Sequence, residues 1–373
     1  MVCWQRTLEN LGMKQFGDVY RAKRVLVTGH TGFKGSWLSL WLKQLGAEVV
    51  GISLAPETQP NHWSLLGLQS SVQHHEIDIR QATEVASVFR ATHPEIVFHL
   101  AAQPLVRRSY RDPLETWSTN VMGTANVLEA CRQTTSVRAI LAVTTDKCYE
   151  NQEWAWGYRE TDRLGGHDPY SASKAGSELV AASYRSAFFH TDGAPLVATA
   201  RAGNVIGGGD WSEYRLIPDL VRAVAAQESL EIRSPNATRP WQHILESLSG
   251  YLLLGQNLIE GNQKFDGAWN FGPERSGNCT VADVLIKLQS HWPEMHWHQT
   301  AVPQPHEANL LYLDSAKAHN QLGWQPVWNL DTTLEKTADW YRAFQNRQTT
   351  ISTQQLAQYV EAAQKAQVGW VSA

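Results

Sequence analysis

The sequence has few cysteines and no long hydrophobic run. Its four cysteines, Cys3, Cys131, Cys148 and Cys279, stand far apart, which argues against a disulfide framework and favours reduced thiols. No stretch approaches the roughly 20 apolar residues of a membrane-spanning helix, and the N-terminus lacks the apolar core of a signal peptide. We therefore expect a soluble, cytoplasmic protein that has no membrane partner.

Charge of one sign is also scarce. The net charge is -4, and like charges never form a block of more than a few residues, so a nucleic-acid partner is not expected. The 373 residues, 43% of them hydrophobic, are enough for a large domain with a smaller one attached.

Short runs rich in β-formers alternate with segments of helical periodicity. Strands are predicted over 24–29, 47–54, 95–103, 138–145 and 196–207, and helices over 35–46, 124–133 and 170–188. This alternation predicts an α/β fold with a Rossmann-type doubly wound parallel sheet. After about residue 205 the chain is rich in Gly, Pro and Trp, which is typical of a smaller mixed α/β domain over the carboxyl ends of the strands.

These changes of composition divide the chain. We expect an N-terminal extension over 1–23 and a large domain over 24–205, to which segments around 240–272 return. The smaller domain comprises 206–240 and 273–345 in this interpretation, and a helical tail covers 346–373. Since ligands of doubly wound folds bind in the crevice beyond the strand ends, the smaller domain is expected to hold the substrate.

A glycine-rich loop, "TGHTGFKG", joins the first strand to the first helix. Gly29, Gly32 and Gly35 follow the spacing G-x-x-G-x-x-G, which permits a tight turn and a close approach of backbone to a pyrophosphate at the helix N-terminus. The loop therefore predicts dinucleotide binding in the large domain, rather than strand-to-helix packing alone. Lys34, within the loop, either contacts a phosphate or is solvated, and the second interpretation is the more common one.

The adenosine end of the predicted site is less clear. Ser53 and Leu54 stand where an NAD-binding fold often carries a carboxylate, and no arginine stands there for a 2'-phosphate. NAD is therefore favoured over NADP only by this absence. Asp78 is either an acceptor for the adenine amino group or a helix cap, and Ala101 and Ala102 are small enough for a strand end that passes close to a cofactor.

A tyrosine and a lysine share one face of the predicted helix 170–188. Tyr170 and Lys174 are four residues apart, so they stack on that face. An ammonium close to a phenol stabilises the phenolate, which can take a proton from a substrate hydroxyl while hydride leaves. With Thr145 at the end of the fourth strand, the pair predicts a dehydrogenase-type site; the alternative is an exposed Tyr and Lys on a surface helix.

The motifs "TGHTGFKG", "HLAAQP", "NVMGT", "TTDK", "YSASK", "RAGNVIGGGDW" and "RPWQHI" together resemble the extended short-chain dehydrogenase/reductase family, in its nucleotide-sugar-modifying branch. The resemblance covers the chain from about Arg24 to about Trp328. It implies NAD as cofactor and a nucleotide sugar as substrate. It also implies cofactor contacts from Gly29, Thr31, Gly32, Phe33, Gly35, Asp78, Ile79, Ala101, Ala102, Asn120, Tyr170 and Lys174.

The family's dehydratases give the stretch "VTTDKCYE" a meaning. In them sugar C4 is oxidised, water is eliminated across C5 and C6, and the hydride returns to C6. Such a cycle needs an acid for the C6 hydroxyl and a base for C5, and the resemblance assigns Asp146 as the acid. Lys147 stands where other members carry Glu, and this departure resembles the members that act on CDP-glucose, which supply deoxysugars for surface polysaccharides such as the O-antigen.

Two roles for Lys147 remain open in the sequence. As a free amine, favoured by burial and nearby positive charge, it is the C5 base. As a charged ammonium it stabilises the enolate while another group moves the proton.

On the substrate side the resemblance assigns Asn204 to the phosphates, Arg239 to the diphosphate and Arg215 to the neighbourhood of the nucleotide. A planar guanidinium suits a diphosphate, although a loop arginine such as Arg215 is often a surface ion pair. Asn120 is expected to be buried and to organise the active-site helix. The family also implies a homodimer formed through a face that includes the Tyr170 helix.

Other chemistries are less well supported. His291, His296 and His298 match no complete metal-ligand pattern, so no metal is expected, and no partner argues for a reactive Cys148. A nucleotide-sugar 4-epimerase shares the glycine loop and the Tyr/Lys pair but does not need Asp146 and Lys147. A non-catalytic NAD-binding sensor needs none of these catalytic side chains.

Overall fold

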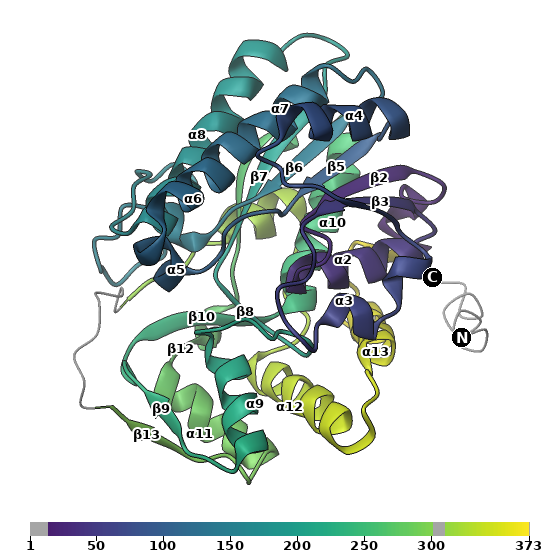
Figure 1. Cartoon of the computed structure of the whole chain (residues 1–373). Coiled ribbons are helices and arrows are strands. Elements are labelled where there is room, and N and C mark those ends of the chain that lie inside the picture. Colours follow the sequence, from purple (N-terminus) through teal and green to yellow (C-terminus); the bar gives the residue numbers. More distant parts are fainter. Residues whose placement is uncertain (1–13, 301–309, 373) are drawn as a thin grey trace.

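The computed structural model of the chain describes residues 14–300 and 310–372. Its largest sheet has seven parallel strands in the order β11-β7-β6-β5-β2-β3-β4 (Figure 1). These strands are β2 (Arg24–Thr28), β3 (Glu48–Ser53), β4 (Gln73–Glu76), β5 (Ile96–His99), β6 (Ala139–Val143), β7 (Leu196–Ala202) and β11 (Gly267–Phe271). The predicted α/β fold with a doubly wound parallel sheet is confirmed.

Helices cover both faces of this sheet, as Figure 1 shows. One face carries α4 (Ala82–Thr92), α7 (Gly123–Arg132) and α8 (Pro169–Phe188); the other carries α2 (Phe33–Gln44) and α10 (Ile244–Ile259). Successive strand residues enter opposite cores: Val25 and Val27 pack with α2 and α10, and Leu26 packs with α4 and α7. Because both faces are covered, the central strands are apolar throughout rather than alternating.

A smaller lobe lies at the carboxyl ends of the strands (Figure 1). Its three-stranded sheet has the order β12-β10-β8, formed by β8 (Asn204–Ile206), β10 (Thr238–His243) and β12 (Asn278–Thr280). A second pair, β9 (Leu230–Ile232) and β13 (Trp297–Gln299), is parallel. The helices of this lobe are α9 (Leu216–Ala226), α11 (Val281–His291) and α12 (Leu330–Arg347).

The prediction of one continuous strand over 196–207 is wrong. β7 ends at Ala202, and β8 starts at Asn204 in the other sheet, where it pairs with β10. Between them, a side chain on Gly203 would come within 2.3 Å of Pro240 and 3.0 Å of Asp146. The chain passes between the two sheets at a point where only a residue without a side chain fits. After β10 it returns: α10 packs on the large sheet and β11 pairs with β7.

The two ends of the described chain meet. β1 (Lys14–Gln15) is antiparallel to β14 (Val371–Ser372), and the rings of Phe16 and Trp370 stack with centroids 4.9 Å apart. The tail helix α13 (Ser352–Lys365) contacts α2. Residues 14–23 therefore close the core on the α2 side, whereas the rest of the predicted extension, with Cys3, lies outside the described residues.

The remaining helices are short: α3 (His62–Leu65), α5 (Val106–Arg111) and α6 (Pro113–Trp117). Single turns of 3-10 or π-helix cover Phe16–Asp18, Leu68–Ser70, Ser118–Met122, Asp146–Cys148, Gln263–Phe265, Arg275–Gly277 and Ala318–Leu322. Within the part of the chain that the structure describes, every helix is too short or too polar to cross a membrane.

Candidate active site

A cavity of about 1090 Å³ opens where the strand order reverses, between the carboxyl ends of β2 and β5. This is where doubly wound folds bind their ligands. Nearly all the predicted site residues line it: Gly29, Thr31, Gly32, Phe33, Gly35, Asp78, Ile79, Ala101, Ala102, Thr145, Asp146, Lys147, Tyr170, Lys174, Asn204, Arg215 and Arg239. The fold thus brings the predicted cofactor, catalytic and substrate residues into one space.

The glycine loop fits a dinucleotide. Gly29 has a φ of +75°, and a side chain there would come within 2.7 Å of the backbone of Ala101. A side chain on Gly35 would come within 2.1 Å of the carbonyl oxygen of Gly29. Helix α2 begins beyond Gly32 without a side-chain cap, so its first amides face the cavity and can meet a pyrophosphate.

Lys34 is half-buried on the cavity wall and has a partner within the protein. Its ammonium donates a hydrogen bond to Tyr251 Oη on α10 at 3.3 Å. Burial lowers the pKa of Lys34 to about 7, and the positive charges of Arg215 and Lys174 act in the same direction. No local sequence pattern indicates this arrangement, because Tyr251 is far from the loop along the chain.

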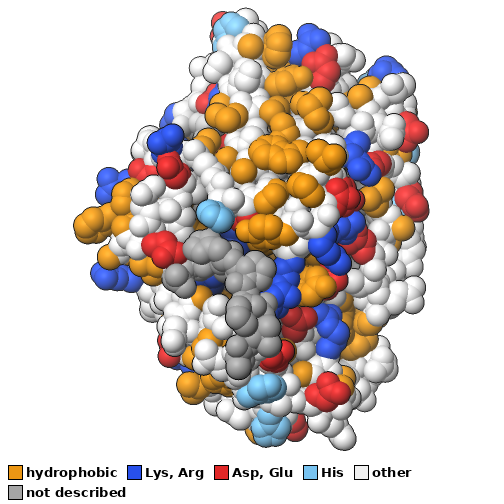
Figure 2. All heavy atoms as spheres, turned by 60° about the vertical axis from the view of Figure 1, so that its left-hand side comes forward, with side chains coloured by type: hydrophobic (Ala, Val, Ile, Leu, Met, Phe, Trp, Pro, Cys, Tyr) orange, Lys and Arg blue, Asp and Glu red, His pale blue; other side chains and the backbone are white. Residues whose placement is uncertain are grey.

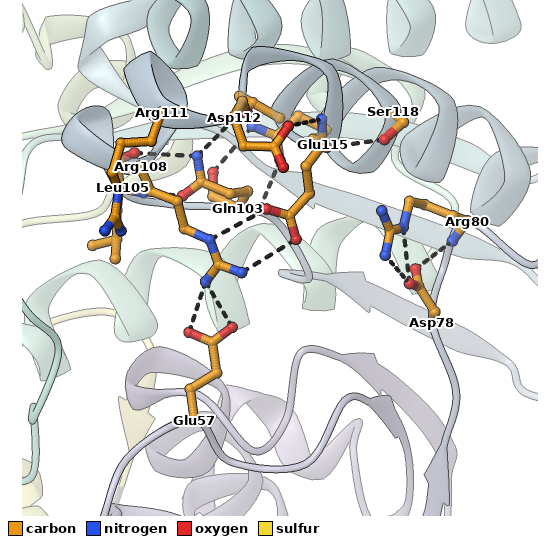
Figure 3. A network of polar contacts seen from close by, with 12 residues as sticks. Glu57, Asp78, Arg80, Gln103, Leu105, Arg108, Arg111, Asp112, Glu115 and Ser118 are labelled. Carbon is orange, nitrogen blue, oxygen red and sulfur yellow. Dashed lines mark hydrogen bonds and ion pairs between the residues drawn. The ribbon is translucent and has the colours of Figure 1, made fainter.

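The end of the cavity that is predicted to hold the adenosine is lined by paired charges (Figure 3). Both carboxylate oxygens of Asp78 accept hydrogen bonds from Arg80, one from its backbone and one from its guanidinium. Asp78 is not a helix cap, since α4 has Gln81 as its N-cap residue. Glu57, beyond the end of β3, accepts two hydrogen bonds from Arg108, which also donates to Glu115.

Asn120 lies behind the cavity rather than on its wall. Its side chain accepts a hydrogen bond from the backbone of Gln103 at 2.8 Å and donates to Ser173 Oγ on α8 at 2.8 Å. It sits in the π-helical turn Ser118–Met122, a distortion that is frequent at functional sites. Asn120 therefore ties α8 to the segment after β5, although it does not line the cavity as a cofactor contact.

The turn after β6 places three consecutive side chains together. Thr145 Oγ1 donates to Asp146 Oδ1 at 3.0 Å and accepts from the backbone of Lys147 at 3.3 Å. Burial raises the pKa of Asp146, although the charges of Lys147 and Arg239 oppose this. Asp146 can therefore keep a proton to a higher pH than an ordinary aspartate, as a general acid must. Lys147 is half-buried.

Tyr170 and Lys174 lie in the first two turns of α8, which Asp168 caps. Burial raises the pKa of Tyr170 to about 12, whereas a hydrogen bond with Thr145 and the charge of Arg215 lower it. Burial lowers the pKa of Lys174 to about 8 against the charge of Glu178, so Lys174 is largely charged at neutral pH. Its ammonium donates to the carbonyl oxygen of Val143 at 3.1 Å.

The predicted substrate residues come from the smaller lobe. Asn204 lies in β8 and Arg239 in β10, where the guanidinium is buried and donates to the backbone of Thr238. Arg215 precedes α9 and forms an ion pair with Asp210 at 3.1 Å. Arg215 therefore both forms an ion pair and lines the cavity.

Among the described residues no cysteine lines the cavity, and His62 contributes to its wall, whereas His291, His296 and His298 do not. Cys131, Cys148 and Cys279 are unpaired thiols, and burial raises the pKa of the Cys148 thiol well above its usual range, which disfavours the reactive thiolate. No cluster of three or more potential metal ligands occurs within residues 14–300 and 310–372.

Known proteins resemble the chain over most of its length. The family model described as GDP-mannose 4,6 dehydratase matches residues 26–337. A CDP-glucose 4,6-dehydratase of Salmonella typhimurium is 47% identical over 88% of this chain and 92% of that protein. A dTDP-glucose 4,6-dehydratase of Xanthomonas campestris is 27% identical over 85% of this chain and 92% of its own length.

Solved structures agree with the fold. The structure of UDP-glucose 4-epimerase from Thermus thermophilus in complex with NAD has a TM-score of 0.75 and 25% identity, covering 86% of this chain and 99% of that one. The resemblance seen in the motifs is thus confirmed over residues 26–337. The chain belongs to the GDP-mannose 4,6-dehydratase family of nucleotide-sugar dehydratases.

Proposed function

We propose that the chain is a CDP-glucose 4,6-dehydratase, which converts CDP-glucose to CDP-4-keto-6-deoxyglucose with loss of water. The observation that carries this proposal is the buried Asp146, its pKa raised, in the same cavity as Tyr170. An acid at this place serves elimination and is not needed for epimerisation. The choice of CDP-glucose follows the Salmonella relative and Lys147, which the motif resemblance links to the members that act on CDP-glucose.

NAD is the proposed cofactor. The Gly29 to Gly35 loop and the uncapped start of α2 suit its pyrophosphate. At the adenosine end, Arg80 and Arg108 are engaged by carboxylates (Figure 3), which favours a ribose hydroxyl over the 2'-phosphate of NADP. Glu57 is the carboxylate nearest along the chain to the end of β3, where Ser53 and Leu54 stand.

Oxidation at C4 comes first. Bound NAD would supply the hydride acceptor for sugar C4 and the hydride donor for C6. Thr145 orients the C4 hydroxyl, and Tyr170 takes its proton, helped by its hydrogen bond with Thr145 and the positive charge of Arg215. Lys174, one turn further along α8, is its proposed partner. Because the product keeps the C4 ketone, the proton taken by Tyr170 is released to solvent, from which Asp146 regains the proton that it gives to the leaving water.

Elimination uses the next two residues of the turn. The ketone acidifies the C5 proton, Lys147 removes it or stabilises the resulting enolate, and Asp146 protonates the departing C6 hydroxyl. Arg239 and Asn204 would hold the substrate's diphosphate, a task for which a buried planar guanidinium is suited. Arg215 would lie beside the nucleotide.

The test is mass spectrometry of the purified protein with NAD and four substrates, CDP-glucose, dTDP-glucose, UDP-glucose and GDP-mannose, in heavy water. We expect CDP-glucose alone to lose one water and to gain a solvent deuteron at C5. Because the structural neighbours include 4-epimerases, isomerisation of one sugar without loss of water is the competing result, and it would replace the proposal.

We also propose a homodimer that uses α6 and α8. Leu114 and Trp117 on α6 and Leu179 and Phe188 on α8 are exposed apolar side chains, and Figure 2 shows hydrophobic side chains gathered on this side of the molecule. Contiguous apolar surface of this kind marks an interaction site.

The dimer is tested by light scattering. Leu179→Glu places a charge on α8 and is expected to give a monomer where the unchanged protein is a dimer. Ile286→Glu on α11 is the matched control, since Ile286 and Leu179 are both 61% exposed. Dissociation by both variants, or by neither, would argue against this interface.

A further inference from the structure

The catalytic turn 145–148 is anchored to α8 at its N-terminal side. The carbonyl oxygen of Val143 accepts a hydrogen bond from Lys174 at 3.1 Å, and Thr144 Oγ1 donates to Glu178 Oε1. Lys174 and Glu178 are four residues apart and so lie on one face of α8. The face of α8 that carries Tyr170 therefore also forms hydrogen bonds with the two residues that precede Thr145.

Glu178 is held in turn by a buried partner. Arg201 Nη2 on β7 donates to Glu178 Oε2 at 2.8 Å, and both side chains are 3% exposed. Thr199 Oγ1 donates to the same oxygen at 2.7 Å. Burial opposes the charge of Glu178, yet Arg201 and the two threonine hydroxyls outweigh it and lower the pKa of Glu178. The pair is thus charged and fully hydrogen-bonded on the carboxylate side.

The other end of Arg201 reaches the C-terminal side of the turn. Its Nη1 donates to Tyr149 Oη at 2.8 Å, and the guanidinium lies 4.9 Å from the centre of the Tyr149 ring. Tyr149 Oη then donates to Asn270 Oδ1 on β11 at 2.7 Å. Tyr149 is buried and does not line the cavity, so these contacts act on the position of the turn and not on the substrate.

A buried ion pair adds little to stability compared with apolar side chains of the same volume, but its geometry is specific. Here the pair joins α8, β7 and both flanks of one turn. We propose that Glu178 and Arg201 form a clamp on the catalytic turn, in which Tyr149 is a positioning residue for Asp146 and Lys147. The proposal rests on the proposed dehydratase function, because it assigns the clamp to the elimination step.

Tyr149 is two residues from Lys147 and three from Asp146. Thr145 is held from the other side of the turn, by the bond of Thr144 to Glu178 and by its own hydrogen bond with Tyr170, neither of which involves the Tyr149 hydroxyl. Loss of the Tyr149 hydroxyl should therefore disturb elimination more than hydride transfer. Tyr149→Phe removes only that hydroxyl and keeps the ring stacked on Tyr158, 5.1 Å away.

The experiment compares steady-state rates on CDP-glucose deuterated at C4 or at C5. For Tyr149→Phe we expect kcat to fall about tenfold, the effect of a lost hydrogen bond to a charged group of about 1.4 kcal/mol. The isotope effect at C5 should grow, and that at C4 should shrink. KM should stay within about twofold, because Tyr149 does not touch the cavity.

Tyr158→Phe is the control, since the Tyr158 hydroxyl bonds to the loop of Asn151 and Gln152 and not to Arg201 or Asn270, and it should behave like the unchanged protein. A kcat within about twofold for Tyr149→Phe, or a larger isotope effect at C4 instead of C5, overturns the clamp. Absence of dehydration by the unchanged protein overturns the proposed function and the clamp's role with it.

Discussion

Asp146 Oδ1 accepts a hydrogen bond from Thr145 at 3.0 Å, while Asp146 Oδ2 is buried without a partner among the described residues. A buried carboxylate oxygen without a partner favours the protonated acid, and a proton on Oδ2 is what a leaving C6 hydroxyl requires. The proposed orienting hydroxyl and the proposed acid for elimination are thus neighbours in one turn.

Replacing Asp146 by Asn should separate these steps. The amide keeps the size and the hydrogen bond with Thr145 but has no proton to give, so we expect turnover to fall about 10² to 10³-fold. Hydride transfer from C4 should persist and appear at 340 nm in a single turnover. Asp192→Asn, at an exposed position, is the control, and loss of the 340 nm signal in Asp146→Asn would contradict the assignment.

Replacing Tyr170 by Phe should stop the reaction earlier. Without the phenolate no group takes the C4 proton, and we expect hydride transfer to slow by about 10³-fold. Binding of NAD, measured by calorimetry, should change little. Tyr184→Phe, on the same helix but outside the cavity wall, should retain full activity; retained turnover in Tyr170→Phe would remove Tyr170 from the mechanism.

The lowered pKa of Lys34 predicts how the stability of the protein depends on pH. Burial lowers its pKa to about 7 from an ordinary value of 10.5, so between these values the unfolded chain binds more protons and the folded state gains stability as pH rises. Below about pH 7 Lys34 is charged in the folded protein, so the full free-energy cost of burying that charge lowers the stability. Lys34→Met should therefore raise the free energy of unfolding more at pH 6.5 than at pH 10.

We expect the increase in the free energy of unfolding caused by Lys34→Met to be larger at pH 6.5 than at pH 10 by about 1 kcal/mol or more. Urea unfolding at the two pH values measures it. Lys365→Met, at an exposed position in the last turn of α13, should change stability equally at both. An equal change for Lys34→Met would mean that Lys34 is solvated after all.

Phe16 tests whether residues 14–23 belong to the core. Its ring is fully buried between Trp41 and Trp370, so Phe16→Ala should lower the free energy of unfolding by about 3 to 5 kcal/mol. Ile286→Ala, at an exposed side chain on α11, is the control and should cost far less. A small effect of Phe16→Ala would place this segment outside the cooperative fold.

The sequence predicted the residues whose meaning depends on short spacing. The glycine loop, the Tyr170 and Lys174 pair and the Thr145 to Lys147 stretch each lie within a few residues of one another, and each follows a strand or opens a helix. The chemistry of these motifs can therefore be predicted without knowledge of the tertiary structure. The change of composition near residue 205 is visible too, but the chain leaves the large sheet at Gly203, earlier than the apolar run 196–207 suggested.

Other features were decided only in three dimensions. The hydrogen bond of Lys34 with Tyr251 and the contact of Phe16 with Trp370 join residues 217 and 354 positions apart. No local sequence pattern predicts partners that are so far apart along the chain.

What the sequence alone determined is which chemical groups are present and which of them share a turn or a helix face, because backbone geometry ties close spacing to close contact. What the tertiary structure decided is which groups are buried, which charges are paired and therefore which way their pKa values move, since burial and partners come from distant parts of the chain. The clamp of Glu178 and Arg201 belongs to this second class.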